Sequence, residues 1–401
     1  MQLCFFEDEK LTNFHPLTLT RPLDDLRIGI FTIAEKWRRA LDEDSFSRIL
    51  RTNLSGTFKG GSIDKGDSCV WINSRYLPND QLLKEIDNLS EGTCLQSGED
   101  VIAAHTDGAS SQQWLEEGTP DFSNLLVVQS MGYECLEHLW DLFQMNGRSI
   151  KDDFEHIQHV RKGSISLDAS LLKEGEITVC EDAEIEAQTV LDAREGPIYI
   201  GPGASVLVGS VLRGPVAVCE NAIIKAGSTI NEDTTVGPVC KVGGEVENTV
   251  FHSYSNKAHR GYIGNSVVGQ WCNFGSGTTV SNLKTNYGNV RVADWETGID
   301  EDSGEQFIGI MMGDHCKTAI NSVINSGTVT GVSCNILSRD FPPTLIRSFS
   351  WVGSNVVQPY QLDKAIRAMK RMMIRRDIEI TDAYEDMMST IFKQRYHGHP
   401  A

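Results

Sequence analysis

Aliphatic residues return at every sixth position through the middle of the chain. The stretch IIKAGSTINEDTTVGPV, residues 223–239, carries them at Ile224, Ile230 and Val236. An α-helix would repeat near 3.6 residues and a half-buried strand every second residue, so neither explains this spacing. The full series, without a missed position, is Ile200, Val206, Leu212, Val218, Ile224, Ile230, Val236 and Val242.

A second column of residues follows four positions behind the first. Its members are small or β-branched: Ala204, Ser210, Val216, Ala222, Ser228, Thr234, Cys240 and Val246. A β-helix built of hexapeptides explains both columns, because each six-residue side of a triangular coil points one bulky side chain into the lumen and turns at a small residue. The pattern therefore predicts a parallel β-helix.

The sixfold pattern also extends beyond this central series. It begins near Val179, resumes at Ile263 and again at Met312, and ends at Ile336. The intervals from Val242 to Ile263 and from Val280 to Met312 are not multiples of six, so we expect chain to be looped out of the coil at both places. Function is often found where such local rules fail.

The two ends of the chain follow different patterns. Residues 1–160 indicate a mixed α/β domain, with strands expected at 2–7, 69–73 and 124–129 and helices at 79–89 and 134–147. Asp24 and Asp25 are expected to start a helix that runs to Arg39, since acidic residues favour a helix N-terminus. Residues 97–120 and 284–306 have no clear period and are expected to be loops.

Apolar residues at helical spacing mark the carboxyl end. Leu362, Ile366, Met369 and Met373 predict a helix that covers the open end of the coil, as a solenoid requires. The expected domains are thus an α/β domain over residues 1–160, a β-helix over 161–345, and an extended segment with capping helices over 346–401.

Composition narrows the possible partners. The formal net charge of -19 over 401 residues argues against nucleic-acid binding, which needs clustered Lys and Arg. No run of about 18 apolar residues is present, and the first residues are acidic, unlike a secretory signal, so we expect a cytoplasmic protein without a membrane partner. The ten cysteines form no C-x-x-C pair, and the sequence identifies no metal ligands.

A long motif lies across the first interruption. Residues 255–283 fit the skeleton S-N-x-x-H-x-x-Y-x-G-x-S-x-x-G, followed by N-x-G-x-G-T and N-L. This skeleton resembles the acetyltransferase part of the left-handed β-helix enzymes that acetylate glucosamine-1-phosphate and then couple a sugar-1-phosphate to UTP or dTTP. The resemblance implies a left-handed coil, acetyl-CoA as co-substrate and assembly as a homotrimer.

The same resemblance assigns roles to individual residues. It implies that His259 is the catalytic base, that Asn282 supports the reacting groups, and that Tyr262 and Asn273 bind the amino sugar. Two lysines, Lys241 and Lys284, stand where the family places cations near the sugar phosphate.

These roles suit the residue types involved. An unperturbed imidazole titrates near pH 6.5 and can take and return a proton, while amides and a phenol bond sugar hydroxyls or an oxyanion. The alternative is that His259 only bonds a loop carbonyl.

A second, weaker resemblance lies near the amino terminus. The segment HPLTLTRPLDDLRIG, residues 15–29, is similar to the start of sugar nucleotidyltransferases, which implies nucleotide contacts by Thr18 and Arg21. The preceding loop, EDEKLTNFH, contains no glycine, although glycines let the backbone approach phosphates closely. Its acidic residues would repel the phosphates unless they held Mg²⁺.

These observations lead to a hypothesis about function. The chain is expected to be a transferase of sugar-nucleotide biosynthesis, an N-acetyltransferase for an amino-sugar-1-phosphate joined to a sugar-1-phosphate nucleotidyltransferase domain that uses a nucleoside triphosphate. One alternative is that only nucleotidyl transfer is active and the β-helix serves trimerisation. Another is a non-catalytic sugar-nucleotide-binding or structural protein.

Overall fold

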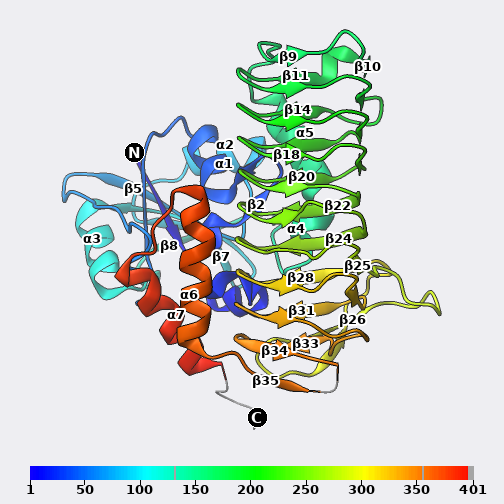
Figure 1. Cartoon of the computed structure of the whole chain (residues 1–401). Coiled ribbons are helices and arrows are strands. Elements are labelled where there is room, and N and C mark those ends of the chain that lie inside the picture. The colour runs from blue at the N-terminus through cyan, green and yellow to red at the C-terminus, as the bar shows by residue number, and fades with distance from the viewer. Residues whose placement is uncertain (131, 355, 396–401) are drawn as a thin grey trace.

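The molecule consists of a tall stack of coils with an α/β domain and two C-terminal helices at its side (Figure 1). The computed structural model describes residues 1–130, 132–354 and 356–395. The expected fold class is confirmed: an α/β domain, a parallel β-helix and a helical carboxyl end. No described helix is both long enough and apolar enough to span a bilayer.

Most coils contribute a short strand to each of three faces. Face one contains β11 (Ile177–Val179), β14 (Ile198–Ile200), β17 (Val216–Val218), β20 (Thr234–Val236), the ends of β22 (Glu245–Phe251) and β24 (Tyr262–Val268), β28 (Ile310–Met312), β31 (Thr328–Thr330) and β33 (Leu345–Ile346). Face two contains β9 (Ser164–Ile165), β12 (Glu184–Ile185), β15 (Ser205–Val206), β18 (Ile223–Ile224), β21 (Lys241–Val242), β23 (Asn256–Lys257), β29 (Lys317–Thr318), β32 (Asn335–Ile336) and β34 (Ser350–Val352). Face three contains β10 (Ser170–Leu172), β13 (Val190–Asp192), β16 (Val211–Arg213), β19 (Thr229–Ile230), the starts of β22 and β24, β25 (Thr279–Val280) and β30 (Val323–Ile324).

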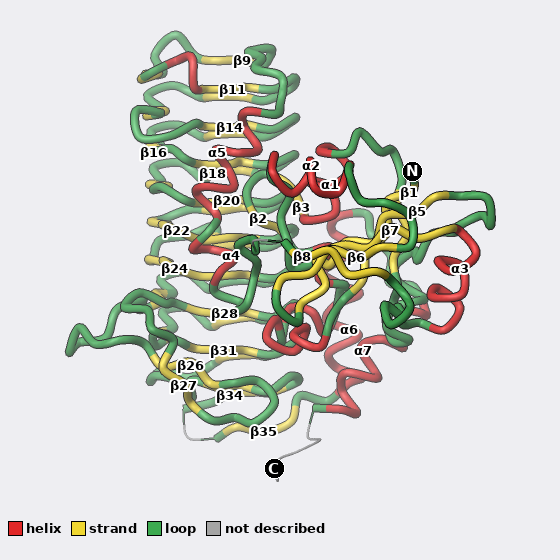
Figure 2. The backbone as a smooth tube through the Cα atoms, turned by 180° about the vertical axis from the view of Figure 1, so that it is seen from behind, coloured by secondary structure: helices red, strands yellow, loops and turns green. Residues whose placement is uncertain are grey.

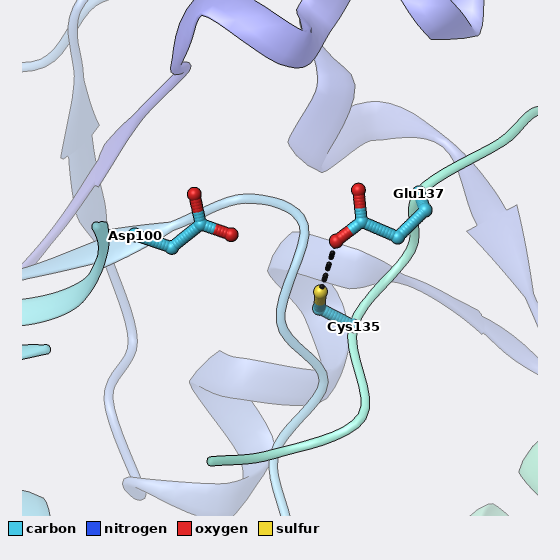
Figure 3. Close-up of side chains that lie close together, drawn as sticks. All are labelled: Asp100, Cys135 and Glu137. Atoms are coloured by element: carbon cyan, nitrogen blue, oxygen red, sulfur yellow. Dashed lines mark hydrogen bonds between the residues drawn. The ribbon is translucent and has the colours of Figure 1, made fainter. Parts of the chain in front are cut away.

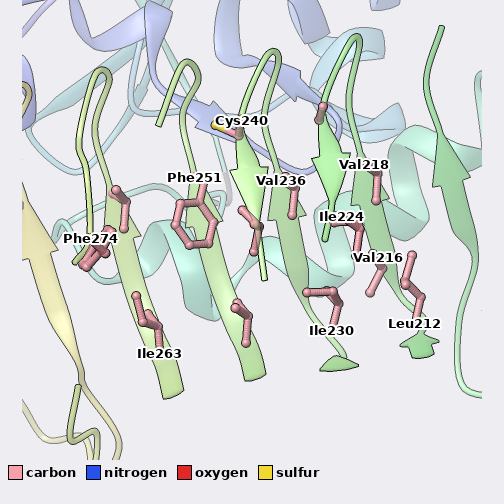
Figure 4. Close-up of a cluster of buried hydrophobic side chains, with 14 of the residues drawn as sticks. Leu212, Val216, Val218, Ile224, Ile230, Val236, Cys240, Phe251, Ile263 and Phe274 are labelled. Atoms are coloured by element: carbon pink, nitrogen blue, oxygen red, sulfur yellow. The ribbon is translucent and has the colours of Figure 1, made fainter. Parts of the chain in front are cut away.

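The lumen holds the aliphatic series that the sequence predicts. All eight side chains from Ile200 to Val242 are fully buried in one cluster (Figure 4). Strand register places Ile224 directly above Val242, so like residues stack from coil to coil. Burying each such side chain is worth roughly 1.5–3 kcal/mol, which makes this column the main stabilising feature of the coil.

The first interruption of the pattern does not leave the coil, contrary to expectation. Strand β22 pairs with β20 of the preceding coil and with β24 of the following coil, and β23 pairs with β21. Two short steps explain the broken period: Val246 enters the lumen four residues after Val242, and Phe251 enters it five residues after Val246. Lys257 then takes the next lumen position. The coil shortens its sides and continues, because parallel pairing between neighbouring coils is kept.

The second interruption does leave the coil. Between Val280 and Met312 the chain forms an antiparallel hairpin of β26 (Arg291–Ala293) and β27 (Asp300–Asp302). Strand β25 nevertheless pairs with β30, on the far side of this insertion. In Figure 1 the insertion projects beside the lower coils. Residues 284–306, expected to be loop, therefore contain two strands.

The N-terminal domain is built around a six-stranded sheet. Its strand order is β4 (Phe46–Arg48), β1 (Gln2–Phe6), β5 (Ser68–Asn73), β7 (Asp100–Asp107), β6 (Thr93–Ser97) and β8 (Leu126–Gln129). Its helices are α1 (Ile33–Ala40), α2 (Asp80–Asp87), α3 (Gly108–Glu117), α4 (Asp141–Gln144) and α5 (Asn146–Glu155), and a small hairpin joins β2 (Arg27–Ile28) to β3 (Phe31–Thr32).

Three local expectations in this domain are wrong. The helix expected at residues 134–147 begins only at Asp141, with α4, and α5 follows from Asn146. No α-helix starts at Asp24: residues Leu23–Asp25 form a 3-10 turn, and α1 begins only at Ile33, capped by the Thr32 hydroxyl and the Glu35 side chain. Residues 97–120 are not a loop, since they contain all of β7 and all of α3. Strand β7 pairs on both sides, with β5 and β6, and this long-range pairing decides its conformation.

The N-terminal domain packs directly on face one of the coil. Helices α4 and α5 contact strands β17, β20, β22 and β24, and Figure 2 shows both helices lying along the coils. The core of the domain continues into the coil through Val250, Val267, Met311 and Val329. One of the three faces is therefore covered by the chain itself.

The C-terminal helices lie beside the coil. The sequence predicted that they cover its open end, and this prediction is wrong. Helices α6 (Leu362–Met373) and α7 (Asp382–Gln394) pack on Val332 and Phe349 of the last coils and on Leu54 of the N-terminal domain. The edge of face two is instead covered by β35 (Val357–Pro359), which runs antiparallel to β34. The helices fill the apolar junction between the two domains, because their buried side chains find more apolar surface there.

Candidate active site

His259 lies at the corner between face two and face three. It follows β23 and precedes β24, and its side chain is exposed. Among the described residues none forms a hydrogen bond with its imidazole, whereas its backbone carbonyl accepts from the Lys257 ammonium. The imidazole is thus open to solvent while the backbone that carries it is fixed from inside the coil.

Tyr262 and Asn282 meet on face three. The Asn282 Nδ2 donates to the Tyr262 hydroxyl at 2.9 Å and to the Asn265 Oδ1 at 2.7 Å. Gly264 makes this contact possible, because a Cβ there would lie 2.2 Å from the Tyr262 hydroxyl. The cluster joins the first interruption to the base of the projecting hairpin.

Burial changes the pKa of Tyr262. Desolvation, followed by the nearby Glu247 and Glu245 carboxylates, raises the pKa of Tyr262 to about 12. The phenol is therefore protonated at neutral pH, and because its oxygen accepts from Asn282, its hydrogen remains to donate. The two predicted residues form one hydrogen-bonding unit.

The other predicted residues of the coil lie on face two or on the insertion. Asn273 is exposed and stands level with Asn256, which pairs in turn with Lys241 one coil earlier. Lys284 is at the start of the insertion and donates to the Asn289 carbonyl at 3.1 Å. Within one chain the candidate residues therefore surround a corner on two sides.

Lys241 belongs to a group of basic side chains. Burial lowers the pKa of its ammonium, and Arg376, Lys225 and Arg375 lower it further by repulsion. The two arginines follow α6, at Ile374–Arg376. The fold brings these cations together from distant parts of the sequence, and Arg375 and Arg376 were not predicted as site residues. Only their basic side chains in the last turn of a predicted helix hinted at them.

Thr18 and Arg21 do not face a nucleotide pocket. The Thr18 hydroxyl is buried and bonds the His15 Nδ1 at 2.8 Å. The Arg21 guanidinium is 1% exposed and binds Asp314 of the coil and Asp25, with its Nη1 3.0 Å from the His252 Nε2. In this structure both residues join the N-terminal segment to its surroundings.

Strand β1 has a parallel neighbour on each side, β4 and β5. An α/β sheet ordinarily binds its ligand at the carboxyl ends of such strands, and we call this region, at the ends of β1 and β5, the crevice. Arg75 fills this crevice. Its Nε lies 2.7 Å from Asp8, its Nη2 2.8 Å from Asp100 and its Nη1 3.0 Å from Glu137. Lys10 adds a second cation, 3.1 Å from Asp100.

These pairings bear on Mg²⁺ and nucleotide binding. Asp100, Cys135 and Glu137 lie close enough together for a cation (Figure 3). Arg75 and Lys10 already neutralise the carboxylates, and Glu7 is held by Arg51. The loop after β1 forms a 3-10 helix, Glu9–Phe14, capped by Asp8. The residues present do not fit a magnesium-bound triphosphate.

Comparison with known proteins relates both halves of the chain to enzymes. Residues 3–162 match the family described as sugar nucleotidyl transferase. A bifunctional sugar-1-phosphate nucleotidylyltransferase/acetyltransferase of Sulfurisphaera tokodaii is 31% identical over 155 residues, covering 34% of this chain and 37% of that protein. The bifunctional protein GlmU of a Cyanothece species is 22% identical over 242 residues, covering 55% of this chain and 48% of that protein.

Among solved structures, a UDP-N-acetylglucosamine acyltransferase of Francisella novicida aligns with 60% of this chain and 90% of its own, at 10% identity and a TM-score of 0.27. The chain spans about half of the length of the Cyanothece relative and less of the Sulfurisphaera one. By these matches the chain is similar to the bifunctional sugar-1-phosphate nucleotidyltransferase/acetyltransferase proteins, and residues 3–162 match the sugar nucleotidyl transferase family.

Proposed function

We propose that the coil is an acetyl-CoA-dependent N-acetyltransferase for an amino-sugar-1-phosphate of the glucosamine-1-phosphate type. The observation that carries this proposal is the Tyr262–Asn282–Asn265 cluster beside the His259 corner. Of these residues, His259, Tyr262 and Asn282 occupy motif positions to which the family resemblance assigns a part in the reaction. The acetyltransferase named among the relatives supports the same reaction class.

The chemistry needs a base and a hydrogen-bonding wall. The His259 imidazole would take a proton from the sugar amine as its nitrogen attacks the thioester carbonyl carbon. The carbon–sulfur bond then breaks, the amide forms, and the thiolate of CoA takes up a proton. The Tyr262 hydroxyl and the Asn282 amide are placed to bond sugar hydroxyls or the oxyanion.

The basic residues of face two suit the sugar phosphate. Lys241 and the arginines Arg375 and Arg376 gather positive charge on a chain that is acidic overall. A few local cations suffice for a small anion. Their position beside Asn273 and Asn256 makes this strip of face two our candidate phosphate site.

Assembly as a homotrimer is part of the proposal. The candidate residues lie around an exposed corner, and a neighbouring copy would complete the wall of the site. Face one is covered by the N-terminal domain, so contacts between copies would use the other two faces.

Nucleotidyl transfer is a second candidate, favoured by the match of residues 3–162. It would use a nucleoside triphosphate, UTP or dTTP, with Mg²⁺. The crevice would have to open first, because Arg75 now pairs with the carboxylates that line it.

The experiment supplies the full chain with glucosamine-1-phosphate and acetyl-CoA and measures CoA by chromatography. We expect release to fall about 10²–10⁴-fold in His259→Ala, the range typical of general base catalysis, and to be unchanged in His156→Ala, an exposed histidine at the C-terminal cap of α5. Equal activity of His259→Ala and wild type would refute the assignment. Pyrophosphate release from N-acetylglucosamine-1-phosphate with UTP or dTTP tests the second candidate.

A further inference from the structure

One lumen position of the coil holds a cation. Lys257 follows Val242 in the stack of face two and stands level with Phe274 of the next coil, yet its side chain is 1% exposed. The two residues stacked directly against it in this column, Val242 and Phe274, are apolar. A charge in such surroundings is costly unless it is hydrogen-bonded, so its partners explain its presence.

The Lys257 ammonium binds two backbone carbonyls. It donates to the Gly243 carbonyl at 2.8 Å and to the carbonyl of His259. Gly243 belongs to one coil and His259 to the next. A single side chain thus joins two successive corners from inside, and one of them carries the proposed base.

Neighbouring coils satisfy their corner carbonyls differently. The residue just before each strand of face three carries a hydroxyl in most of them: Ser228 and Ser210 donate to the Lys225 carbonyl, and Ser322 and Thr278 to that of Ala319. The equivalent residues beside the site are Gly244 and Gly261, which have no hydroxyl.

Tight packing explains these glycines. A Cβ on Gly244 would lie 2.8 Å from the His259 carbonyl oxygen and 2.9 Å from the Lys257 Nζ, and one on Gly261 would lie 1.9 Å from the Thr278 carbonyl oxygen. Both have positive φ, +80° and +122°, which glycine adopts without strain. The corners at the site are therefore built without hydroxyls, and the ammonium takes over their hydrogen bonds.

We propose that Lys257 is a positioning residue that holds the backbone of residues 258–261, and with it His259, in the geometry required for acyl transfer. This role rests on the proposed function of His259. The side chain acts from the lumen through the carbonyls of Gly243 and His259, and it does not touch substrate. An aliphatic residue would pack in this position but would leave both carbonyls without their donor.

The test compares Lys257→Met with Ile224→Met, a repacking control in the same lumen column. Two measurements are made on the full chain: hydrogen exchange of the Glu245 and Gly277 amides, and the kinetics of CoA release. These amides donate to the carbonyls of Gly261 and Arg260 and so report on the corner.

We expect Lys257→Met to exchange these amides about tenfold faster and to lose about tenfold in kcat with KM for acetyl-CoA changed less than threefold. Its melting temperature should not fall below that of the control, since methionine suits an apolar lumen.

Three outcomes are informative. Unchanged exchange and unchanged kcat overturn the proposal. A fall in melting temperature with faster exchange throughout the coil also overturns it, because the role is then structural only. If wild type releases no CoA, the proposed function fails, and local exchange at the corner alone decides whether Lys257 holds it.

Discussion

The coil and the N-terminal domain arrange their polar residues in opposite ways. On the coil the candidate groups are open: His259 is exposed, and Tyr262 keeps a hydrogen to donate. In the crevice of the N-terminal domain Arg75 is fully buried, and its charge is matched by Asp8, Asp100 and Glu137. Both regions match enzymes; among the described residues, the candidate groups of the coil remain available for hydrogen bonding, whereas the carboxylates around Arg75 are paired within the protein.

The two regions differ in whether their charged and polar groups already have partners within the protein. A site for a charged ligand needs groups that are satisfied only when the ligand is bound. When the protein itself supplies the counter-ions, as it does around Arg75, the same arrangement of charged groups stabilises the fold. Substitutions in the two regions should therefore separate stability from activity.

The largest effect is expected from a charge in the apolar lumen. Ile224→Lys places an unpaired ammonium among fully buried side chains and should cost more than about 4 kcal/mol, enough to unfold the coil. Circular dichroism and urea titration would measure the loss. Ile223→Lys is the matched control, because that side chain is only half-buried. A soluble Ile224→Lys protein with wild-type cooperativity would contradict the assigned lumen.

Removal of the Arg75 cation from the crevice should cause the next largest loss of stability. Arg75→Leu leaves three carboxylates without their main partner, and removing one member of such a buried network typically costs about 3–5 kcal/mol. Urea titration measures the change, and Arg148→Leu, exposed on α5, is the control. CoA release per folded molecule should stay near wild type. A stable Arg75→Leu variant would mean that the network is not structural.

On face three we expect a substitution to lower activity while leaving stability nearly unchanged. Tyr262→Phe removes the donor hydroxyl and should lower kcat about 10-fold, while the free energy of unfolding changes by less than about 1 kcal/mol. Steady-state kinetics and urea titration on the same preparation give both values. Tyr287→Phe, exposed on the insertion, is the control. Unchanged kcat in Tyr262→Phe would remove the tyrosine from the site.

The smallest effect is a pH dependence of stability. Burial lowers the pKa of Lys257 from 10.5 to about 8. Below about pH 8 both folded and unfolded chains carry the proton, and the cost of burying the charge is present in full. Between about 8 and 10.5 the unfolded chain keeps a proton that the folded chain has lost, so stability rises with pH in this window.

This dependence is isolated by comparing wild type with Lys257→Met. The difference in unfolding free energy should move in favour of wild type by about 1 kcal/mol between pH 7 and pH 9. Urea titrations of both proteins across this range measure it. A constant difference would show that the ammonium is not desolvated.

The repeat made the coil predictable from the sequence. A lumen side chain packs against the equivalent residue of the next coil, as Ile224 packs against Val242. The period of the sequence therefore corresponds directly to contacts in the structure. The pair of Tyr262 and Asn282 was also predictable from the sequence, because both residues belong to a long motif. The same reading failed for residues 97–120, where pairing of β7 with distant strands decided the structure.

The sequence by itself determined the three-sided coil, since a sixfold return of aliphatic residues fills such a lumen. The tertiary structure decided where the charges went. Arg21 meets Asp314 from the far end of the chain, Arg75 collects carboxylates from three separate segments, and Lys257 enters the lumen beside glycines that have no hydroxyl to offer. Charged side chains take whichever partner the fold brings near, and no local period encodes that choice.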